Sequence, residues 1–234
     1  HRDLHSFPTR RSSDLLTAFV DLYTRTFTDA SEREDPAEWP PRLYGELPAP
    51  QPRMHLLVAV DTHAQPPRLL GGIAFEYYRD SRCGLLTYLV TDAEHRRRGL
   101  ARRLVLRAIE LLQDDARTFG TDLRGVYAET EDPDQVGDDG NAMAPRERLQ
   151  ALARLGARRI DIPYVQPALA GGNGRCRHLL LLAFHPQADG IAGAAVRDFL
   201  HEFYRALGVE APEQDADFRA MAQALAETTA LKAL

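Results

Sequence analysis

Apolar and polar positions along the chain follow patterns that predict both helices and strands. Residues 15–27 carry apolar side chains at helical spacing, which predicts a helix. Short apolar runs predict three strands, over 54–60, 69–78 and 84–91. The turn-forming pair Asp80–Ser81 predicts that the last two strands form a hairpin. The proline-rich stretch 28–52 predicts a loop with one short helix.

The next part of the chain continues this mixed pattern. Residues 99–112 place apolar side chains on one helical face and arginines on the other, which predicts an amphipathic helix. Pro145 and Gly156 bracket a shorter helix, because proline suits the first helical position and glycine the position after the last. Further strands are predicted over 123–130, 157–165 and 175–184, with a glycine turn at 171–174.

The C-terminal part of the chain has a different pattern. Residues 191–207 and 215–230 each carry one apolar face at helical spacing, which predicts two helices. We therefore expect a mixed α/β core over 15–186 and an all-helical extension over 187–234. The apolar faces of the two helices could cover the core or pair with a second copy in a homodimer, and the pattern favours neither.

Composition and charge narrow the class of protein. The 234 residues are 44% hydrophobic and 27% charged, which excludes a disordered chain. No uncharged apolar run reaches the roughly 18 residues of a membrane-spanning helix. Cys83 and Cys176 are too few for a disulfide scaffold or a cysteine-only zinc site. With a net charge of −5 as well, we expect a soluble cytoplasmic protein without a nucleic-acid or membrane partner.

The first residues resemble a foreign segment. The string HRDLHSFPTRRSSDL resembles the conceptual translation of a sequencing-library adapter. We therefore leave residues 1–14 out of the reasoning on fold and function, as one leaves out a tag. The alternative is a basic N-terminal arm that carries Arg2, Arg10 and Arg11. On the first interpretation, the natural N-terminus is missing.

One loop between a predicted strand and a predicted helix carries recognisable chemistry. After the strand 84–91 the sequence reads DAEHRRRGLA, and the helix begins near Gly99. The first N–H groups of a helix have no partner within it and lie at the positive end of its dipole, so this end binds phosphate. Gly99 and Ala101 allow a ligand to approach the backbone, and Arg97 and Arg98 add charged donors.

The segment Arg96-x-x-Gly99-x-Ala101 resembles the Gln/Arg-x-x-Gly-x-Gly/Ala motif of the GNAT acyltransferases. The resemblance implies that this loop grips the pyrophosphate of acetyl-CoA and that the preceding strand pairs with the pantetheine arm. The element order of 15–186 is also similar to that family, which implies a mostly antiparallel sheet flanked by helices. The implied cosubstrate-binding residues are Leu89, Val90, Thr91, Arg96, Arg97, Arg98, Gly99, Leu100 and Ala101.

A second match to the motif occurs nearer the C-terminus, at Gln187-x-x-Gly190-x-Ala192. It also lies between a predicted strand and a predicted helix. We favour the first match because further strands follow it, so that a sheet can open beside it to admit the pantetheine arm. Only helices are expected after the second match, and Asp189 would face a phosphate there.

Acyl transfer to an amine needs a base, groups that stabilise the oxyanion, and an acid for the departing thiolate. Backbone N–H groups of the strand 84–91 could stabilise the oxyanion, as they do in the family. Glu129 is the leading candidate for the base and Glu76 the reserve, although Glu129 could equally begin an acidic surface loop. Leu152 stands where the family has its tyrosine acid. Tyr164 is therefore the candidate for the acid, or else a packed core residue.

The resemblance implies an N-acetyltransferase that transfers an acetyl group directly from acetyl-CoA to a primary amine of a small molecule or peptide. The sequence does not identify that acceptor. The acidic stretch 129–139 suggests that Asp132 and Asp134 rim the acceptor pocket and attract a cationic amine. The alternative is a GNAT-fold module that binds coenzyme A or a partner without turnover. Leu152 favours this alternative, and the intact phosphate loop favours the enzyme.

No metal is expected from the sequence. His178 and His185 flank the last predicted strand but lack the spacing of paired metal ligands. The acidic stretch 129–139 does not fit a calcium-binding loop, which requires glycine at its sixth position and glutamate at its twelfth.

Overall fold

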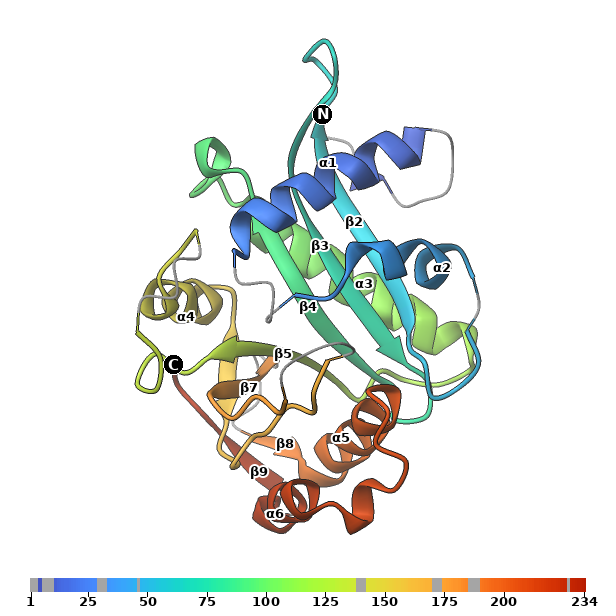
Figure 1. Ribbon diagram of the computed structural model, residues 1–234, viewed down its shortest axis with the longest axis vertical. Helices are drawn as coiled ribbons and strands as arrows, with labels where there is room; N and C mark the ends of the chain where they lie inside the picture. Colours follow the sequence, from blue (N-terminus) through green and yellow to red (C-terminus); the bar gives the residue numbers. More distant parts are fainter. Residues whose placement is uncertain are drawn as a thin grey trace.

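A long sheet with helices on both faces forms the centre of the molecule (Figure 1). Its strands are β1 (Leu4–His5), β2 (Arg53–Asp61), β3 (Arg68–Tyr78), β4 (Cys83–Thr91), β5 (Gly125–Glu131), β6 (Ala157–Ile160), β7 (Leu179–Phe184), β8 (Gly190–Ala192) and β9 (Thr228–Lys232). They lie in the order β1-β2-β3-β4-β5-β7-β6-β9-β8. β4 and β5 pair in parallel, whereas the other neighbours are antiparallel. The predicted mixed, mostly antiparallel fold is confirmed.

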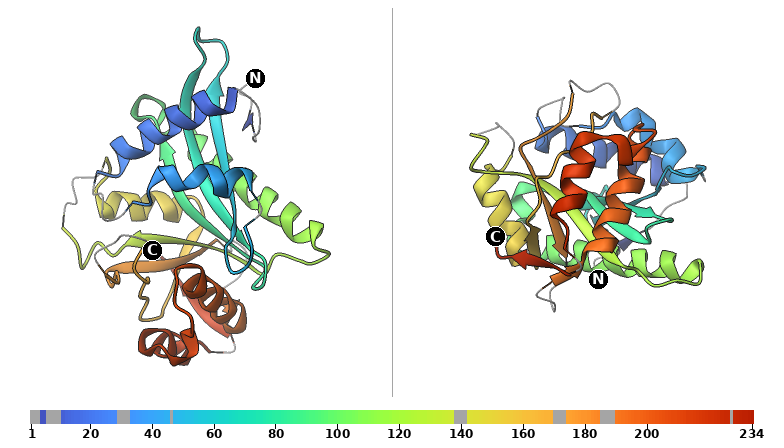
Figure 2. Two further views of the ribbon diagram at one scale, coloured as in Figure 1. Left: turned by 45° about the vertical axis from the view of Figure 1, so that its right-hand side comes forward. Right: turned by 90° about the horizontal axis from the view of Figure 1, so that it is seen from below.

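The helices divide between the two faces of this sheet. They are α1 (Arg11–Thr26), α2 (Trp39–Tyr44), α3 (Leu100–Thr118), α4 (Pro145–Arg154), α5 (Gly193–Ala206) and α6 (Ala216–Ala224). This computed structural model describes residues 4–5, 11–28, 33–45, 47–137, 142–169, 174–184, 190–226 and 228–234. In it, α1 and α2 lie on the face of the sheet opposite α3 (Figure 2). None of the described helices is long and apolar enough to cross a membrane.

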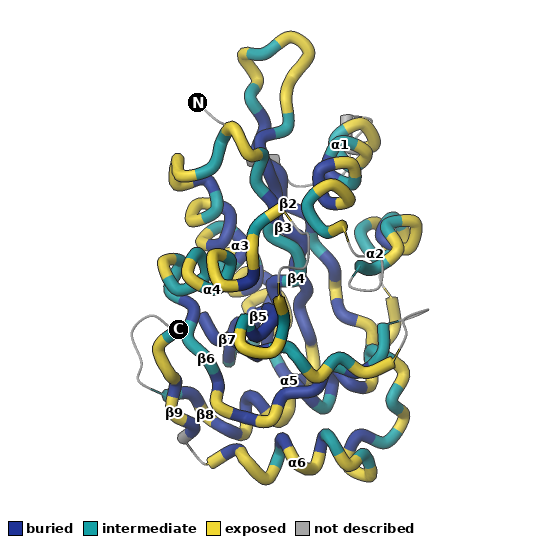
Figure 3. Tube along the Cα trace, turned by 60° about the vertical axis from the view of Figure 1, so that its left-hand side comes forward, coloured by how far each residue is buried: buried dark blue, intermediate teal, exposed yellow. Residues whose placement is uncertain are grey.

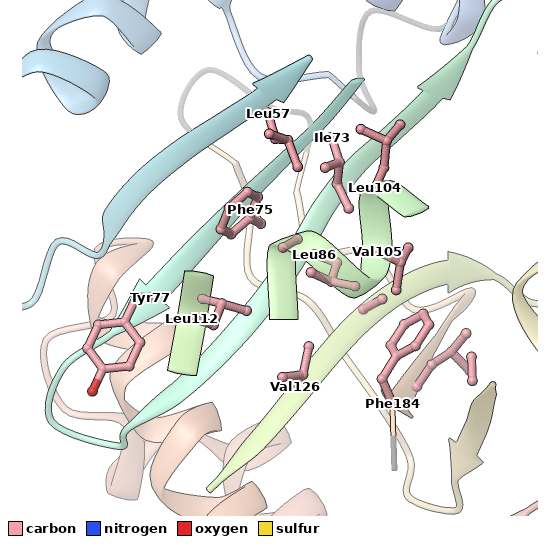
Figure 4. Close-up of a cluster of buried hydrophobic side chains, with 14 of the residues drawn as sticks. Leu57, Ile73, Phe75, Tyr77, Leu86, Leu104, Val105, Leu112, Val126 and Phe184 are labelled. Carbon is pink, nitrogen blue, oxygen red and sulfur yellow. The ribbon is translucent and has the colours of Figure 1, made fainter. Parts of the chain in front are cut away.

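The helix α3 buries its apolar face against the middle of the sheet. Leu104, Val105 and Leu112 lie among side chains from β3, β4 and β5, as Figure 4 shows. Leu104, Val105 and Leu112 recur at helical spacing, whereas Arg102 and Arg103 are exposed and Arg107 is half-buried. The cluster also receives side chains from α4, such as Leu149 and Leu152. This packing fixes the first turn of α3 next to the end of β4.

The opposite face of the sheet carries two separate apolar clusters. In one, Phe19 and Tyr23 of α1 pack with Trp39 of α2 against β2, β3 and β4. In the other, Phe199 and Phe203 of α5 pack against the lower part of the sheet, together with α6. α1, α2, α5 and α6 thus share one face of the sheet, since alternate residues of a strand point to the same face. A cavity separates the two clusters on this face.

The C-terminal extension contains strands as well as helices, so the expectation of an all-helical tail is wrong. Residues 190–192 form β8 rather than the start of a helix, and 228–232 form β9 rather than the end of one. β9 pairs with β6 and β8, so it covers the edge that β6 would otherwise expose. Gly193 is needed where α5 begins, because a Cβ there would lie 1.9 Å from the Ala226 carbonyl oxygen.

The extension is also tied directly to the core. Glu202 of α5 is buried and accepts hydrogen bonds from the backbone N–H groups of Asp80 (3.1 Å) and Ser81 (2.7 Å), in the turn of the β3–β4 hairpin. Arg124, just before β5, donates to Asp198 of α5 at 2.6 Å. These contacts hold α5 against the hairpin that the sequence predicted at this turn.

Several predicted elements have different bounds in the structure. The first helix begins at Arg11 instead of residue 15, and the helix predicted over 99–112 continues to Thr118. The strands predicted over 157–165 and 175–184 shorten to β6 and β7, since most of the chain between them is irregular. Within that stretch Gln166 and Cys176 form an isolated bridge. His185, Gln187, Asp189 and most of the glycine turn at 171–174 lie outside the described residues.

Candidate active site

β4 and β5 are paired over only part of their length. Their register runs from Cys83 opposite Gly125 to Leu86 opposite Ala128 and then stops, although β4 continues to Thr91 and β5 to Glu131. β4 has an irregularity at Thr87, where the register with β3 shifts. The two strands therefore separate beyond this point and leave an open gap, as the sequence interpretation requires.

The backbone of β4 faces this gap with groups that no strand pairs. β4 remains bonded to β3 on its other edge, and the N–H of Asp92 donates to the Leu70 carbonyl oxygen at 2.9 Å. Since N–H groups alternate between the two edges of a strand, those of Leu89 and Thr91 point away from β3. They are placed to bond an extended ligand that lies in the gap.

The loop after β4 ends at an uncapped helix N-terminus. Asp92 caps a short turn at Ala93–His95 by accepting from the N–H of Glu94 (3.0 Å). Arg97 (φ 60°) and Gly99 (φ 73°) then both adopt the left-handed backbone conformation, and α3 begins without a side-chain cap. Such a turn directs successive N–H groups toward one side and forms a concave anion site.

The predicted cosubstrate-binding residues thus lie along one path. Leu89, Val90 and Thr91 belong to the unpaired end of β4, and Leu100 and Ala101 to the first turn of α3. The side chains of Arg97 and Arg98 are exposed at the loop. That of Arg96 is partly buried and donates to the Ala142 carbonyl oxygen at 3.2 Å.

A cavity of about 540 Å³ opens on the other face of the sheet, between the two apolar clusters. Its walls come from α2, β3, β4, β5, α4, the loop before β7 and the last turn of α5. Thr87 and Tyr88 of β4 and Glu129 of β5 line it, so the cavity reaches the gap between these strands. In Figure 3 most of β4 and β5 is coloured as buried. A ligand in the gap and a second ligand in the cavity would therefore meet at β4 and β5.

Two of the predicted catalytic residues come together beside this cavity, where Glu129 lines the wall and Tyr164 does not. The hydroxyl of Tyr164 donates a hydrogen bond to Oε1 of Glu129, although the two residues are on different elements. The amide Nε2 of Gln166 lies 3.0 Å from each oxygen of the same carboxyl group. Burial raises the pKa of Glu129 to about 7, against the lowering effect of these two hydrogen bonds. Burial and the nearby Glu129 charge also raise the pKa of Tyr164 well above its usual value.

Glu76, the reserve base, has a different environment. Its carboxyl group pairs with Arg42 of α2 and accepts from the hydroxyl of Tyr78 at 2.7 Å. Arg42 also donates to Glu34 at 2.9 Å, and the indole N–H of Trp39 donates to Glu34 at 3.0 Å. Burial raises the pKa of Glu76 to about 7, partly offset by Arg42. A carboxylate held by a guanidinium is a weaker base than one held by neutral donors.

The acidic loop does not take the role suggested for it. Asp132 and Asp134 are not among the residues that line the cavity. Asp132 shapes its own turn by accepting from the N–H of Asp134 (3.1 Å) and from Gln135 (3.0 Å), and Asp134 pairs with Arg146 on α4. Both carboxylates therefore bind groups of the protein near the loop instead of facing the cavity. The acidic residues that do line the cavity are Glu34, Asp35, Glu38, Glu76, Glu129 and Glu131.

Sequence reasoning missed the wall formed by the segment before α2. The backbone N–H of Glu34 lies 3.2 Å from the hydroxyl of Tyr88, and the Glu34 carbonyl oxygen accepts from Tyr23. These contacts hold the segment on β4, beside the gap. The charged residues Glu34, Glu38 and Arg42 at four-residue spacing were a signal of a helical face, but nothing in the sequence says which strand it covers.

One group of side chains has the geometry of a cation site. Ligand atoms of Asp92, Glu94 and His95 lie within 4.8 Å of one another. The guanidinium of Arg68 already contacts Asp92 (3.5 Å) and Glu94 (2.8 Å), so the positive charge beside these carboxylates comes from the protein itself. His178 lines the cavity, where its Nε2 lies 3.3 Å from the Cys176 sulfur and 4.0 Å from Glu131.

Comparison with known proteins identifies the family. The model of the acetyltransferase (GNAT) family matches residues 16–135, which is more than half of the chain and includes β4, the loop at Gly99 and α3. The chain belongs to the GNAT acetyltransferase family. The curated proteins include no match to it. The family generally acetylates amines with acetyl-CoA, which agrees with the gap, the loop and the cavity.

Solved structures with TM-scores above 0.5 show the same fold at low sequence identity. A Bacteroides thetaiotaomicron protein described as a GNAT-family acetyltransferase is 15% identical, with a TM-score of 0.62 over 89% of this chain and 99% of its own. A tandem GNAT protein from the clavulanic acid biosynthesis pathway is 19% identical, with a TM-score of 0.52 over 71% of this chain and 46% of its own. An aminoglycoside 6'-N-acetyltransferase complexed with coenzyme A is 20% identical, with a TM-score of 0.48 over 80% of this chain and 99% of its own.

Proposed function

We propose that this protein is an N-acetyltransferase that transfers the acetyl group of acetyl-CoA directly to a primary amine. The observation that supports this most is the environment of Glu129. Its carboxyl group lines the cavity at the open gap, is held by two neutral donors, and has a pKa of about 7. Near neutral pH such a group can take a proton from an ammonium ion and make the amine a nucleophile.

The backbone supplies the cosubstrate site in this proposal. The free N–H groups at the start of α3, with Gly99 at their centre, bind the diphosphate. The pantetheine arm lies in the gap and pairs with the N–H groups of Leu89 and Thr91. One of these N–H groups, or a neighbouring one on β4, also stabilises the oxyanion that forms when the amine attacks the thioester.

The proton balance uses the pair that the structure brings together. Glu129 accepts a proton from the ammonium group, and the free amine attacks the thioester carbon. As the tetrahedral intermediate collapses, the C–S bond breaks and the thiolate takes the proton of Tyr164. Glu129 then returns a proton to Tyr164 through the hydrogen bond between them. The second proton of the amine leaves to water as the amide forms. Tyr164 thus compensates for Leu152, a residue of α4 that packs against the core.

The charges of the cavity favour an acceptor that carries positive charge. Each arginine that lines it already contacts a carboxylate: Arg42 pairs with Glu34 and Glu76, Arg148 with Glu131, and Arg175 with Asp215 and Asp217. Glu38, in contrast, forms no ion pair with any residue that the structure describes. The cavity therefore attracts a cationic amine, by carboxylates other than those of Asp132 and Asp134.

The test is the release of free thiol from acetyl-CoA in the presence of a panel of amines. We expect release that depends on the amine, with acetylated amine as the second product. Binding of coenzyme A without release for any amine in the panel would instead support the alternative, a GNAT-fold binding module.

A further inference from the structure

Cys176 and His178 place a thiol and an imidazole together on the wall of the cavity. Both residues line it, and the sulfur of Cys176 lies 3.3 Å from Nε2 of His178. Cys176 is a free cysteine and is only half-buried. A histidine beside a thiol can take its proton, and the thiolate that results is the nucleophilic form. The pair therefore has the geometry of a reactive thiol.

The backbone holds this thiol close to Glu129. Cys176 and Gln166 form an antiparallel bridge with both of its hydrogen bonds, at 2.9 and 3.0 Å. Residues opposite each other in such a bridge point to the same face, with Cβ atoms about 5 Å apart. The side-chain amide of Gln166 in turn lies 3.0 Å from each carboxyl oxygen of Glu129. A group attached to the sulfur of Cys176 would therefore lie beside Glu129.

A second polar group on the cavity wall indicates that a ligand enters it. Thr130 lines the cavity and is 5% exposed, and its hydroxyl makes no hydrogen bond with any residue that the structure describes. It precedes Glu131, whose carboxyl group lies 4.0 Å from Nε2 of His178. Buried hydroxyls in folded proteins normally have a partner. A polar ligand in the cavity would supply one.

The charge of the cavity favours one class of reagent for this thiol, because its carboxylates attract cations. We infer that Cys176, activated by His178, is a modification site for small disulfides that carry positive charge. His178 takes the proton of the thiol, and the thiolate attacks one sulfur of the disulfide. The new S–S bond forms as the old one breaks. The sulfur of Cys176 is thereby oxidised, and the half of the disulfide that leaves is reduced and takes the proton from His178.

The half that stays on Cys176 would occupy the space of the acceptor beside Glu129. Modification would therefore block acetyl transfer and leave the cosubstrate loop free. This consequence rests on the proposed function, whereas the exchange reaction itself does not.

Cys83 is a matched control within the same chain. It is buried, and its sulfur lies 3.4 Å from the Ser81 carbonyl oxygen. Burial raises the pKa of its thiol to about 12, so almost no thiolate is present near neutral pH. Cys83 should not react while the protein is folded.

The test is the mass of the folded wild type after treatment with cystamine, a dicationic disulfide, or with 2,2'-dithiodiacetate, a dianionic one. Each rate is divided by the rate of the same reagent with N-acetylcysteine amide, since the two disulfides differ in intrinsic reactivity. We expect one aminoethylthio group per chain, mapped to Cys176 by peptide analysis. The normalised rate with cystamine should be about tenfold higher than with dithiodiacetate at low salt, and the difference should shrink as salt increases. His178→Asn should slow the cystamine reaction about fivefold.

Acetyl transfer provides the second readout. Once excess cystamine is removed, the modified wild type should acetylate an amine at less than about a tenth of its untreated rate and recover when dithiothreitol reduces the mixed disulfide. Its calorimetric titration with coenzyme A should be unchanged. Cys176→Ser treated in the same way should keep its own untreated rate.

The outcomes separate this inference from the proposed function. Equal normalised rates for the two disulfides, addition to Cys83 as fast as to Cys176, or an unchanged rate in His178→Asn would overturn the inference and leave the proposed function standing. A full rate of acetyl transfer by the modified protein would also overturn it, since the attached group would then lie outside the acceptor space. If the untreated wild type binds no coenzyme A, the proposed function fails, and the masses still decide whether Cys176 is the modification site.

Discussion

The cosubstrate loop and the acceptor cavity lie on either side of the same gap, but the sequence encodes them differently. The loop is one contiguous segment, and its chemistry comes from backbone N–H groups around Gly99. The cavity is assembled from α2, β3, β5, α5 and irregular segments far apart in the chain, and its chemistry comes from side chains. A backbone site tolerates changes of side chain, whereas a site made of side chains can change its ligand by substitution. The fold can therefore keep one cosubstrate while its acceptor varies.

The largest effect that we predict comes from a substitution in the acceptor cavity. Glu129→Gln keeps the shape and removes the base, so kcat/KM should fall about a hundredfold to a thousandfold with binding of coenzyme A unchanged. In the wild type, kcat/KM should rise with pH through about 7, because Glu129 must lose its proton to act. The rate over this pH range measures both effects.

The same variant has a consequence for stability. Folding raises the pKa of Glu129 from 4.5 to about 7. The free energy of unfolding therefore falls as pH rises through that range and Glu129 ionises. Glu129→Gln should therefore unfold at the same temperature as the wild type or higher at pH 8. A full rate with glutamine at this position would remove Glu129 from the mechanism.

The loop side predicts a loss of cosubstrate affinity. Gly99 has a φ of 73°, which a β-branched side chain rarely adopts, so Gly99→Val should distort the N–H groups and weaken coenzyme A binding tenfold or more. Gly120, at the other end of α3, has a φ of 67° and equally open surroundings. Gly120→Val should suffer similar strain and bind coenzyme A normally. Equal affinity losses in titrations of both variants would mean that the loop has no special role.

Tyr164 should have a smaller effect than Glu129. Tyr164→Phe removes the hydrogen bond that lowers the pKa of Glu129, so kcat should fall about threefold to tenfold and the rise of rate with pH should move above 7. Tyr204→Phe is the control. The hydroxyl of Tyr204 donates to the Val165 carbonyl oxygen (2.6 Å) and not to Glu129. It should lower stability without moving the pH profile. An unmoved profile in Tyr164→Phe would deny the coupling between Tyr164 and Glu129.

The smallest prediction concerns the charge of the cavity. Glu38→Gln should raise KM for a cationic amine about twofold to threefold at low salt, and the difference should shrink as salt increases. Glu110→Gln on the outer face of α3 removes a charge that pairs with Arg107 away from the cavity, and should leave KM unchanged. Equal KM values in both variants would show that the carboxylate wall does not select the acceptor.

What could be predicted from the sequence follows the same division. The hairpin at Asp80–Ser81, α3 and the loop at Gly99 depend on local patterns, and the structure has them where the sequence predicted them. β8 and β9 were missed because the amphipathic helices predicted over 191–207 and 215–230 extended into these strands. Pairing with the exposed edge of β6 decides for the strand, and no local pattern contains that edge.

The site shows this limit more clearly. Glu129 and Tyr164 were candidates for separate reasons, and only tertiary structure brings their side chains into contact. Asp132 and Asp134 had the right charge but not the right direction, because they bond their own turn and α4. Glu34 and Arg42 had no recognisable motif. Their role at the cavity depends on the packing of α2 on the sheet.

The most direct test of the account is the structure of the protein crystallised with coenzyme A. The account predicts that the diphosphate lies on the N–H groups at the start of α3. It also predicts that the pantetheine arm lies between β4 and β5, with the sulfur reaching the side of the gap where Glu129 faces the cavity. Coenzyme A bound at another surface, with the gap filled by protein side chains, would contradict it.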